Sequence, residues 1–327
     1  MILVYEVDGV DAKILKNLLY NGREGFVDIA RECGVSTNAV RKRFLNMEGR
    51  GIIVGATIQA DYESLGYPAL VTVLLNVESQ HVASSIERLK KIPNVLVFRQ
   101  FNSRYSIRLI ARMRNLKELD RIKEAIRLHN SVIDFRTFFW LGVKNIPENL
   151  SFNISENTAY PVSKTPAKTF VPRKTVSLDE LDHVIAQKLS ENGRMSFRKI
   201  SEEMGTSTDT VIRRYQRLLD NGALKVSIQI NPEKLGYQAN LDFSIAFAFQ
   251  KETAAIVENL AKIPNIIIIL KTSGDYDLHV TAMVRNTEEQ FRIQEEIAKI
   301  PNIARMETAA RRIPDKWPTP IQHISTF

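Results

Sequence analysis

The chain has 327 residues, of which 44% are hydrophobic and 25% charged, and its 45 Lys and Arg against 37 Asp and Glu give a net charge of +8. This length predicts at least two domains, and the composition excludes wholesale disorder, collagen and a coiled-coil rod. The single cysteine, Cys33, can form neither an internal disulfide nor a cysteine-based metal cluster, so we expect a reducing, cytoplasmic location. No apolar run approaches the roughly 18 residues that span a bilayer. The short apolar start before Glu6 lacks the basic leader of a signal peptide.

The chain contains one pattern twice, in a register that aligns Asp11 with Asp182 and Gly51 with Gly222. Between segments 11–51 and 182–222, 15 of 41 positions are identical. Leu65-Gly66-Tyr67 later corresponds to Leu235-Gly236-Tyr237, after one residue drops out. A period this long indicates a duplicated pair of domains rather than a solenoid. We expect domains at 8–60 and 61–143 in copy one, a proline-containing linker over 144–177, domains at 178–230 and 231–313 in copy two, and an extended tail over 314–327.

The first domain of each copy has the apolar spacing of three short helices. In copy one the first helix ends at Asn21-Gly22, the second covers Val27–Cys33 and ends at Gly34, and Ser36 is the expected N-cap of the third. Helix, glycine-containing turn and helix form the helix-turn-helix outline. Residues 51–60 then predict a β-hairpin wing. Copy two repeats this order.

The third helix of each copy carries the candidate DNA-binding side chains. If Val40, Phe44 and Met47 face the core, small hydroxyl and amide groups remain on the first turn, with consecutive cations behind them. Such a turn can meet base edges while Arg and Lys reach phosphates or guanine. A solvated basic face alone would also explain the run, but the repeated helix-turn-helix favours DNA. The candidates are Ser36, Thr37, Asn38, Arg41, Lys42 and Arg43, and in copy two Ser207, Thr208, Asp209, Arg213, Arg214 and Arg217.

The second domain of each copy is predicted to have the ferredoxin-like order β-α-β-β-α-β, which makes the fold class α+β. In copy one the patterns place strands at 69–77, 95–99, 106–113 and 132–140 and helices at 82–91 and 116–128. Copy two gives strands at 241–250, 265–272, 277–284 and 303–310 and helices at 253–262 and 287–299. The apolar run at 266–270 fits a strand that is buried on both faces.

The turns between the second and third strands differ between the copies. Copy two reads Thr272-Ser273-Gly274-Asp275-Tyr276-Asp277, with a glycine and two carboxylates. Copy one reads Phe101-Asn102-Ser103-Arg104-Tyr105-Ser106, with neither glycine nor acid and with Arg99, Arg108 and Arg112 nearby. A Gly-Asp loop by itself indicates only a turn.

These residues together resemble the Lrp/AsnC family of prokaryotic transcription regulators, which join a winged helix-turn-helix to a ligand-responsive effector domain. The resemblance covers roughly 8–143 and 178–313 and rests on Asn-Gly-Arg, Gly-x-Ser-Thr and Leu-Gly-Tyr in both copies. It implies double-stranded DNA as partner, an amino acid as small-molecule effector, no cofactor and no enzymatic activity. The effector site that it implies is Thr272, Ser273, Gly274, Asp275 and Tyr276. Copy one keeps only the tyrosine of this turn, and an anionic ligand held by Arg104 and Arg108 is the hypothesis there.

Members of the family usually carry one copy and dimerise through their effector domains. Two fused copies therefore predict either a pseudo-dimer within one chain or a homo-oligomer in which each copy pairs with its counterpart in another chain. A linker of about 34 residues spans on the order of 100 Å when extended, so both arrangements are allowed.

Two other functions compete with DNA binding. The layout also resembles that of the siroheme decarboxylases, whose tetrapyrrole substrate is rich in carboxylates, and Arg99, Arg104 and Arg108 suit such a substrate. Only His279 is well placed for that chemistry, and a lone strand histidine more often packs. An assembly partner of related regulators, without DNA contact, is the third possibility. No metal-ligand spacing, phosphate-cradling glycine loop or nucleophile elbow occurs, and no membrane partner is expected.

Overall fold

A computed structural model describes residues 4–128, 130–152, 178–248 and 253–319 of the chain. The two copies do not form two separate units. One unit combines both helix-turn-helix segments, and the other combines Tyr62–Lys144 of copy one with Gln238–Ile313 of copy two. Like domains of the two copies therefore associate within one chain, as the pseudo-dimer hypothesis expects.

The helix-turn-helix unit contains two bundles of three helices each. The helices of copy one are α1 (Gly9–Tyr20), α2 (Phe26–Cys33) and α3 (Thr37–Gly49), and the helices of copy two are α6 (Glu180–Glu191), α7 (Phe197–Met204) and α8 (Thr208–Asp220). Gly34 and Gly205 close the second helices with φ of 67° and 62°, the left-handed conformation that glycine adopts at little cost. The predicted helices are confirmed to within a few residues.

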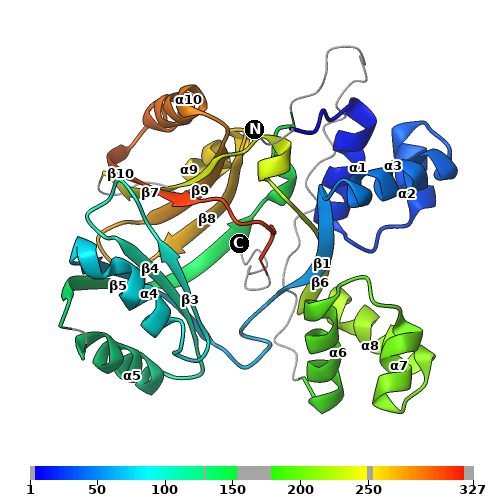
Figure 1. Cartoon of the computed structure of the whole chain (residues 1–327), viewed down its shortest axis with the longest axis horizontal. Helices are drawn as coiled ribbons and strands as arrows, with labels where there is room; N and C mark the ends of the chain where they lie inside the picture. Colours follow the sequence, from blue (N-terminus) through cyan, green and yellow to red (C-terminus); the bar gives the residue numbers. More distant parts are fainter. Residues whose placement is uncertain (1–3, 129, 153–177, 249–252, 320–327) are drawn as a thin grey trace. The chain divides into compact units, whose positions relative to one another are not determined.

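The expected hairpin wing is wrong, because each copy contributes only one strand. The strand β1 (Ile53–Ala60) pairs antiparallel with β6 (Leu224–Ile230) of the other copy. The resulting two-stranded ribbon lies between the two bundles (Figure 1). Helix α1 packs on β6, and α6 packs on β1. Each strand therefore completes the hydrophobic core of the opposite copy, which strand propensity alone does not indicate.

The second unit contains two ferredoxin-like domains, as predicted. Copy one supplies β2 (Ala69–Val77), the short 3-10 helix η1 (Ser79–His81), α4 (Val82–Leu89), β3 (Val95–Arg99), β4 (Ile107–Met113), α5 (Leu116–Arg127) and β5 (Val132–Asn145). Copy two supplies β7 (Ala239–Phe247), α9 (Thr253–Lys262), β8 (Ile266–Thr272), β9 (Leu278–Val284), α10 (Thr287–Ala298) and β10 (Ile303–Arg312).

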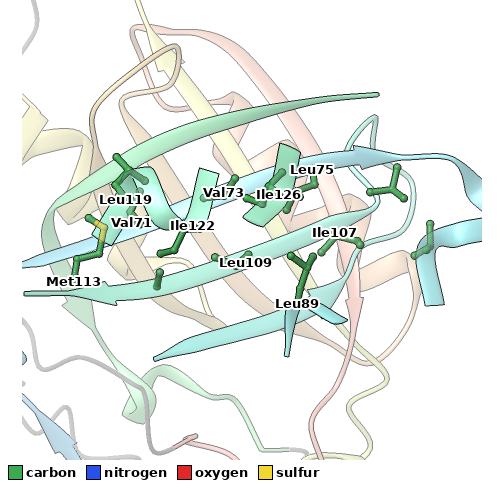
Figure 2. Packing of buried hydrophobic residues seen from close by; sticks show 13 residues of the cluster. Val71, Val73, Leu75, Leu89, Ile107, Leu109, Met113, Leu119, Ile122 and Ile126 are labelled. Atoms are coloured by element: carbon green, nitrogen blue, oxygen red, sulfur yellow. The ribbon is translucent and has the colours of Figure 1, made fainter. Parts of the chain in front are cut away.

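Apolar side chains of the copy-one domain form one continuous core. Ile122 and Ile126 of α5 and Leu89 of α4 pack over Leu109 and Val73 of the central strands, and all five side chains are buried (Figure 2). Burying an aliphatic side chain of this size contributes about 1.5–3 kcal/mol. The strand–helix alternation read from the sequence is thus explained by one shared core.

Both domains have the same strand order, and they join into one eight-stranded sheet of order β10-β7-β9-β8-β5-β2-β4-β3. The join lies between β8 of copy two and β5 of copy one, where the Ser273 amide donates to the Phe139 carbonyl at 3.0 Å. Beyond β3, Phe101 exchanges two backbone hydrogen bonds with Ala310 of β10, at 2.7 and 2.9 Å. The two domains therefore contact each other twice, at the middle of the sheet and where its two edge strands, β3 and β10, meet.

Segments outside the domains are described in part. Residues 153–177 of the predicted linker and 320–327 of the predicted tail lie outside the described residues. After β5, a single 3-10 turn, η2 (Pro147–Asn149), contacts α1, and η3 (Glu233–Leu235) follows β6. In the tail, Trp317 is 4% exposed and forms an antiparallel bridge with Ile230, which places this residue in the helix-turn-helix unit.

Candidate DNA-binding surface and ligand cavity

The third helix of copy one presents the side chains that the sequence predicts. Ser36 is the N-cap of α3 and accepts a hydrogen bond from the Ala39 amide at 3.2 Å. Val40, Phe44 and Met47 are buried, and the opposite face carries the exposed residues Ser36, Thr37, Asn38, Arg41 and Lys42. Within the part of the chain that the structure describes, neither Arg41 nor Lys42 has an ion-pair partner. Both side chains are therefore available to a ligand outside the protein.

Arg43 has a different environment. Its guanidinium contacts the carboxylates of Asp8 and Asp11, at 2.9 Å in the case of Asp11. Asp8 is itself the N-cap of α1, and Asp11 lies in the first turn of that helix. Arg43 thus joins α3 to α1, and its predicted contact with DNA stays a prediction that would require this ion pair to be shared or broken.

Copy two repeats the arrangement with different side chains. Ser207 is the N-cap of α8, accepting from the Thr210 amide at 3.1 Å, and Asp209 and Arg213 are exposed. Thr208 is half-buried, with its hydroxyl 3.0 Å from that of Ser201.

The remaining predicted cations of copy two hold α8 to α6. Arg214 contacts Asp179 at 2.6 Å and Asp182 at 3.1 Å, and Arg217 also contacts Asp182. Hydrogen bonds from Arg214 lower the pKa of the Asp179 carboxyl to about 2. Arg213 alone among the three predicted arginines of this helix has no ion pair within the described ranges. The same division between scaffold and free cations therefore occurs in both copies.

Two arginines bind the bundles to each other in a reciprocal way. Arg23 donates to the Gly193 carbonyl at 2.9 Å and to the Met195 carbonyl at 2.6 Å, and its guanidinium lies 4.1 Å from the Phe197 ring centroid. Its equivalent, Arg194, donates to the Gly22 carbonyl at 2.8 Å and lies over two phenylalanines of copy one. Charge-assisted bonds combined with cation–π contacts are strong for their size. The pairing of the two bundles therefore has specific chemistry.

The glycine of each Asn-Gly-Arg motif lies against the ribbon strand of the opposite copy. The Gly22 amide donates to the Val226 carbonyl at 2.8 Å, and the Gly193 amide donates to the Ala56 carbonyl at 2.8 Å. The sequence interpretation of Asn-Gly as a helix end is confirmed, but the motif's main contacts are between copies. The presence of Asn-Gly-Arg in both copies is the sequence feature that could have indicated these contacts between copies.

The glycine-aspartate turn of copy two lines a cavity of about 670 Å³. Ser273, Gly274, Asp275 and Tyr276 face it, and Gly274 has φ of 112°, a backbone conformation that other residues rarely adopt. Thr272 is buried and donates from its hydroxyl to the Tyr276 carbonyl at 2.9 Å, so it shapes the turn without lining the cavity. Four of the five predicted effector residues thus meet at one cavity.

The corresponding turn of copy one lines the same cavity. Asn102, Ser103, Arg104 and Tyr105 belong to its wall, and Asn102 takes the left-handed conformation, with φ of 55°, in place of a glycine. Asparagine tolerates this conformation better than most residues. The two turns thus line one shared cavity, whose walls come from both copies. Four arginines contribute to it, Arg104, Arg108, Arg136 and Arg305.

A buried ion network forms the floor of this cavity. Arg108 of copy one and Asp242 of copy two are 4% and 3% exposed, and their side chains are 3.3 Å apart. Arg311 also contacts Asp242, and the Thr281 hydroxyl donates to it at 2.7 Å. Although burial alone would raise it, the neighbouring Arg311 and Arg108 hold the pKa of the Asp242 carboxyl well below its usual range. Asp242 therefore stays ionised and paired.

His279 lies in the wall between these groups. Its ring stacks on Phe138 of the other copy at a centroid distance of 4.0 Å, and its Nδ1 lies 3.0 Å from the Ser244 hydroxyl. Burial, with a smaller effect from Arg108, lowers the pKa of His279 to about 3. The imidazole is therefore neutral at physiological pH.

Three polar atoms at the cavity are buried without a hydrogen-bond partner among the described residues. They are Oε1 of Gln100, the hydroxyl of Tyr105 and Nε of Arg108, and all three residues line the cavity. Buried polar groups are normally paired, because an unpaired one costs about 1–3 kcal/mol. Residues of one cavity wall thus contain an acceptor, a donor and a hydroxyl that have no partner among the described residues.

Among the described residues we find neither a metal-binding cluster nor a membrane-spanning helix. No group of three or more His, Cys, Asp and Glu side chains lies close enough there to hold a metal ion. No helix there is both long and apolar enough to cross a membrane.

Comparison with known proteins identifies the domains. The model of the AsnC-type helix-turn-helix domain matches residues 7–48 and 178–219, and that of the Lrp/AsnC ligand binding domain matches residues 246–310. An uncharacterized HTH-type transcriptional regulator of Pyrococcus abyssi is 35% identical over 146 residues, which is 44% of this chain and 92% of that protein. The chain belongs to the Lrp/AsnC family. It is a tandem fusion of two diverged copies of the family's unit, as the sequence repeat predicts.

Further likenesses concern a single copy and the whole chain. The HTH-type transcriptional regulator FL11 of Pyrococcus horikoshii is 33% identical over 129 residues, 39% of this chain and 85% of that protein. The solved structure of the siroheme decarboxylase NirDL matches 96% of this chain and 93% of its own, with a TM-score of 0.62 and 14% identity. The TM-score shows a common fold, and at 14% identity the match shows nothing about activity. The family assignment supports a transcription regulator with a ligand-binding domain.

Proposed function

We propose that this Lrp/AsnC tandem chain binds a specific site on double-stranded DNA through α3 and α8 together. The observation that carries the proposal is that these helices carry two kinds of cationic side chain, one ion-paired and one not. Arg43, Arg214 and Arg217 are held by carboxylates of their own bundle, whereas Arg41, Lys42 and Arg213 are exposed and have no ion pair among the described residues. The paired arginines thus hold each helix to its own bundle, while the exposed cations lie on the face that is left open to DNA.

Binding to a labelled duplex, measured by fluorescence anisotropy at several salt concentrations, tests this proposal. The duplex is taken from genome-wide mapping of bound sites. We expect an affinity for the duplex that falls steeply as the salt concentration rises. Arg41→Ala should weaken binding by about 1–3 kcal/mol if the side chain contacts a base. Lys42→Ala should reduce the slope of log affinity against log salt concentration by about 1 if its side chain contacts a phosphate. Lys117→Ala is the matched control, since Lys117 is exposed on α5 in the effector unit.

The proposal fails if the chain binds specific and random duplexes equally, or binds neither. Absence of binding together with capture of a single-copy relative would instead favour the assembly partner. A pseudo-dimer within one chain, built by the contacts of Arg23 and Arg194, is the proposed DNA-binding form.

We further propose that the cavity binds the small-molecule effector and that this effector is an α-amino acid. Its carboxylate would accept from the Tyr105 hydroxyl and Arg108 Nε, and its ammonium would donate to Oε1 of Gln100, the three buried atoms that lack partners among the described residues. The predicted turn Ser273, Gly274, Asp275 and Tyr276 closes the other side. Thermal shift with a panel of amino acids tests this, and Tyr105→Phe and Gln100→Leu should weaken the response. An unchanged response in both variants would contradict it.

A siroheme-decarboxylase-like activity is the second candidate. The fold likeness over 96% of the chain and the four arginines at the cavity favour it. His279, with its pKa near 3, is poorly suited to supply a proton at neutral pH. The absorbance of siroheme mixed with the protein separates the candidates, because a bound and converted tetrapyrrole changes its spectrum and an amino-acid effector has none.

A further inference from the structure

The two recognition helices of one chain present different side chains at equivalent positions. In the register that aligns Asp11 with Asp182, Asn38 corresponds to Asp209 and Arg41 to Ile212. The side chains at both pairs of positions are exposed, that of Ile212 to 43%. The buried faces of the same helices differ much less in character, since each carries three apolar or aromatic residues at matching positions. Divergence is therefore concentrated on the surface that would meet DNA.

Within one chain the two bundles that carry these unlike helices are joined to each other. The ribbon joins Ile53 to Ile230 and Ala60 to Leu224, so one strand comes from each copy. The reciprocal contacts of Arg23 and Arg194 add a second connection between the bundles. A single chain thus carries one α3 and one α8 in the same unit.

The exposed side chains have different preferences for base edges in the major groove. Asparagine pairs with adenine and arginine with guanine, whereas aspartate accepts from the cytosine amino group and an apolar side chain contacts the thymine methyl. At the first position copy one thus offers Asn38 and copy two Asp209, and further along the helix the corresponding pair is Arg41 and Ile212. Two identical half-sites cannot satisfy both helices.

Asp209 is the most discriminating of these residues. It lies in the first turn of α8, is exposed, and has no ion pair with any residue in the described ranges. A carboxylate there is stabilised by the helix dipole but is repelled by phosphates. Among the base edges of the major groove, a carboxylate most often accepts from the cytosine amino group.

From this we infer that the chain recognises a non-palindromic site with two unlike half-sites. The side chains of α3 contact adenine and guanine, and those of α8 contact cytosine and thymine at the equivalent positions of their own half-site. This inference rests on the proposed DNA binding. It means that the chain binds its site in one orientation only, unlike a symmetric dimer whose operator mirrors its two-fold axis.

Selection of bound sequences from a random duplex pool, with the full chain, gives the motif. We expect two different halves, and a duplex with both halves should bind at least about tenfold more tightly than either inverted repeat. The double variant Asp209→Asn, Ile212→Arg gives α8 the side chains of α3 and should shift the preference toward the inverted repeat of the α3 half. Glu191→Gln, at the exposed end of α6, is the matched control and should leave the motif unchanged.

The possible results are distinct. A palindromic motif, or equal affinity for all three duplexes, overturns the inference and leaves DNA binding intact. A motif that the double variant does not change overturns the assignment of the α8 half to Asp209 and Ile212. Failure to enrich any sequence from the pool refutes the proposed function itself.

Discussion

Replacement of Gly22 or Gly193 by alanine should loosen the pairing of the two helix-turn-helix bundles. A Cβ on Gly22 would lie 2.7 Å from the carbonyl carbon of Ser227 and 2.8 Å from the backbone nitrogen of Ile228. A Cβ on Gly193 would lie 2.9 Å from the backbone nitrogen of Thr57. These neighbours are backbone atoms of the ribbon, so they cannot rotate away as a flexible side chain would. The Asn-Gly turn must move off the strand instead.

The expected cost follows from three effects. Forcing an extra methyl group into a packed site costs typically about 1–3 kcal/mol. The shift also weakens the hydrogen bond from the Gly22 amide to the Val226 carbonyl, now 2.8 Å, which is worth about 1 kcal/mol. Gly22 is not among the glycines with positive φ, so alanine can adopt its backbone conformation. Because alanine also lowers the conformational entropy of the unfolded chain, it offsets about 0.4–1 kcal/mol of this loss. We expect a net loss of about 1–3 kcal/mol for each variant.

Urea unfolding followed by circular dichroism measures this loss, and Gly49→Ala is the matched control. Gly49 is the last residue of α3, it is exposed, and a Cβ there meets no atom within 4 Å. The control should be unchanged or more stable by up to about 1 kcal/mol. Because both glycines lie next to Val226, the double variant should depart from additivity.

The reasoning is refuted if Gly22→Ala and Gly193→Ala unfold at the same urea concentration as the unmodified chain. Destabilisation by Gly49→Ala of the same size would also count against it, since the loss would then reflect any added methyl group rather than contact across the copies.

Three further predictions concern buried or shared charges. Asp242→Asn should lower the free energy of unfolding in urea by about 3–5 kcal/mol, because it leaves Arg108 buried without its carboxylate. Arg108→Met leaves Asp242 paired with Arg311 and should cost less, and equal costs would contradict the proposed network. The pKa of His279 is about 3 in the folded chain and 6.5 in the unfolded chain, so below pH 6.5 the unfolded state binds more protons and the free energy of unfolding falls by about 2 kcal/mol from pH 8 to pH 5. His279→Gln should remove that part of the loss, and an unchanged pH profile would show that the ring is not buried and neutral. Arg23→Met should lower stability by about 1.5–3 kcal/mol through its lost carbonyl bonds, whereas Arg31→Met, on the exposed face of α2, should lie within about 0.5 kcal/mol; similar values for both would argue against the reciprocal contacts.

Local signals accounted for most of the secondary structure. Ser36 and Ser207 cap their helices as predicted, because a serine at the first turn satisfies an amide that the helix leaves free. The ferredoxin-like order followed from the change of apolar period after each helix-turn-helix. These features depend on residues a few positions apart, so periodicity and capping rules reach them.

The partner of a strand cannot be read from its own pattern. The segment after each recognition helix has the composition of a strand, but a hairpin and a ribbon shared by two copies bury the same apolar face. The choice was made by contacts such as that of Gly22 on Ser227, which joins the first helix of copy one to the ribbon strand of copy two. The hairpin prediction failed for this reason.

Charges at the candidate site posed a similar difficulty. The sequence groups Arg108 with neighbouring arginines as a binder of anions, and its side chain is 4% exposed and also pairs with Asp242 of the other copy. An arginine on a strand has the same sequence pattern whether its partner is a ligand or a carboxylate from a distant part of the chain. The cavity between the two turns depends on both copies and has no sequence signature in either.

The buried network also bears on which copies can pair. In copy one Trp140 donates to Thr72 at 2.9 Å, and at the equivalent positions of copy two Arg311 contacts Asp242. Arg108 of copy one then supplies Asp242 with its second cation. Two copy-one domains placed together would bury Arg108 opposite a threonine, with no carboxylate to pair it, and an unpaired buried charge costs several kcal/mol. The core of the effector unit therefore favours the pairing of unlike copies over the pairing of two copy-one domains.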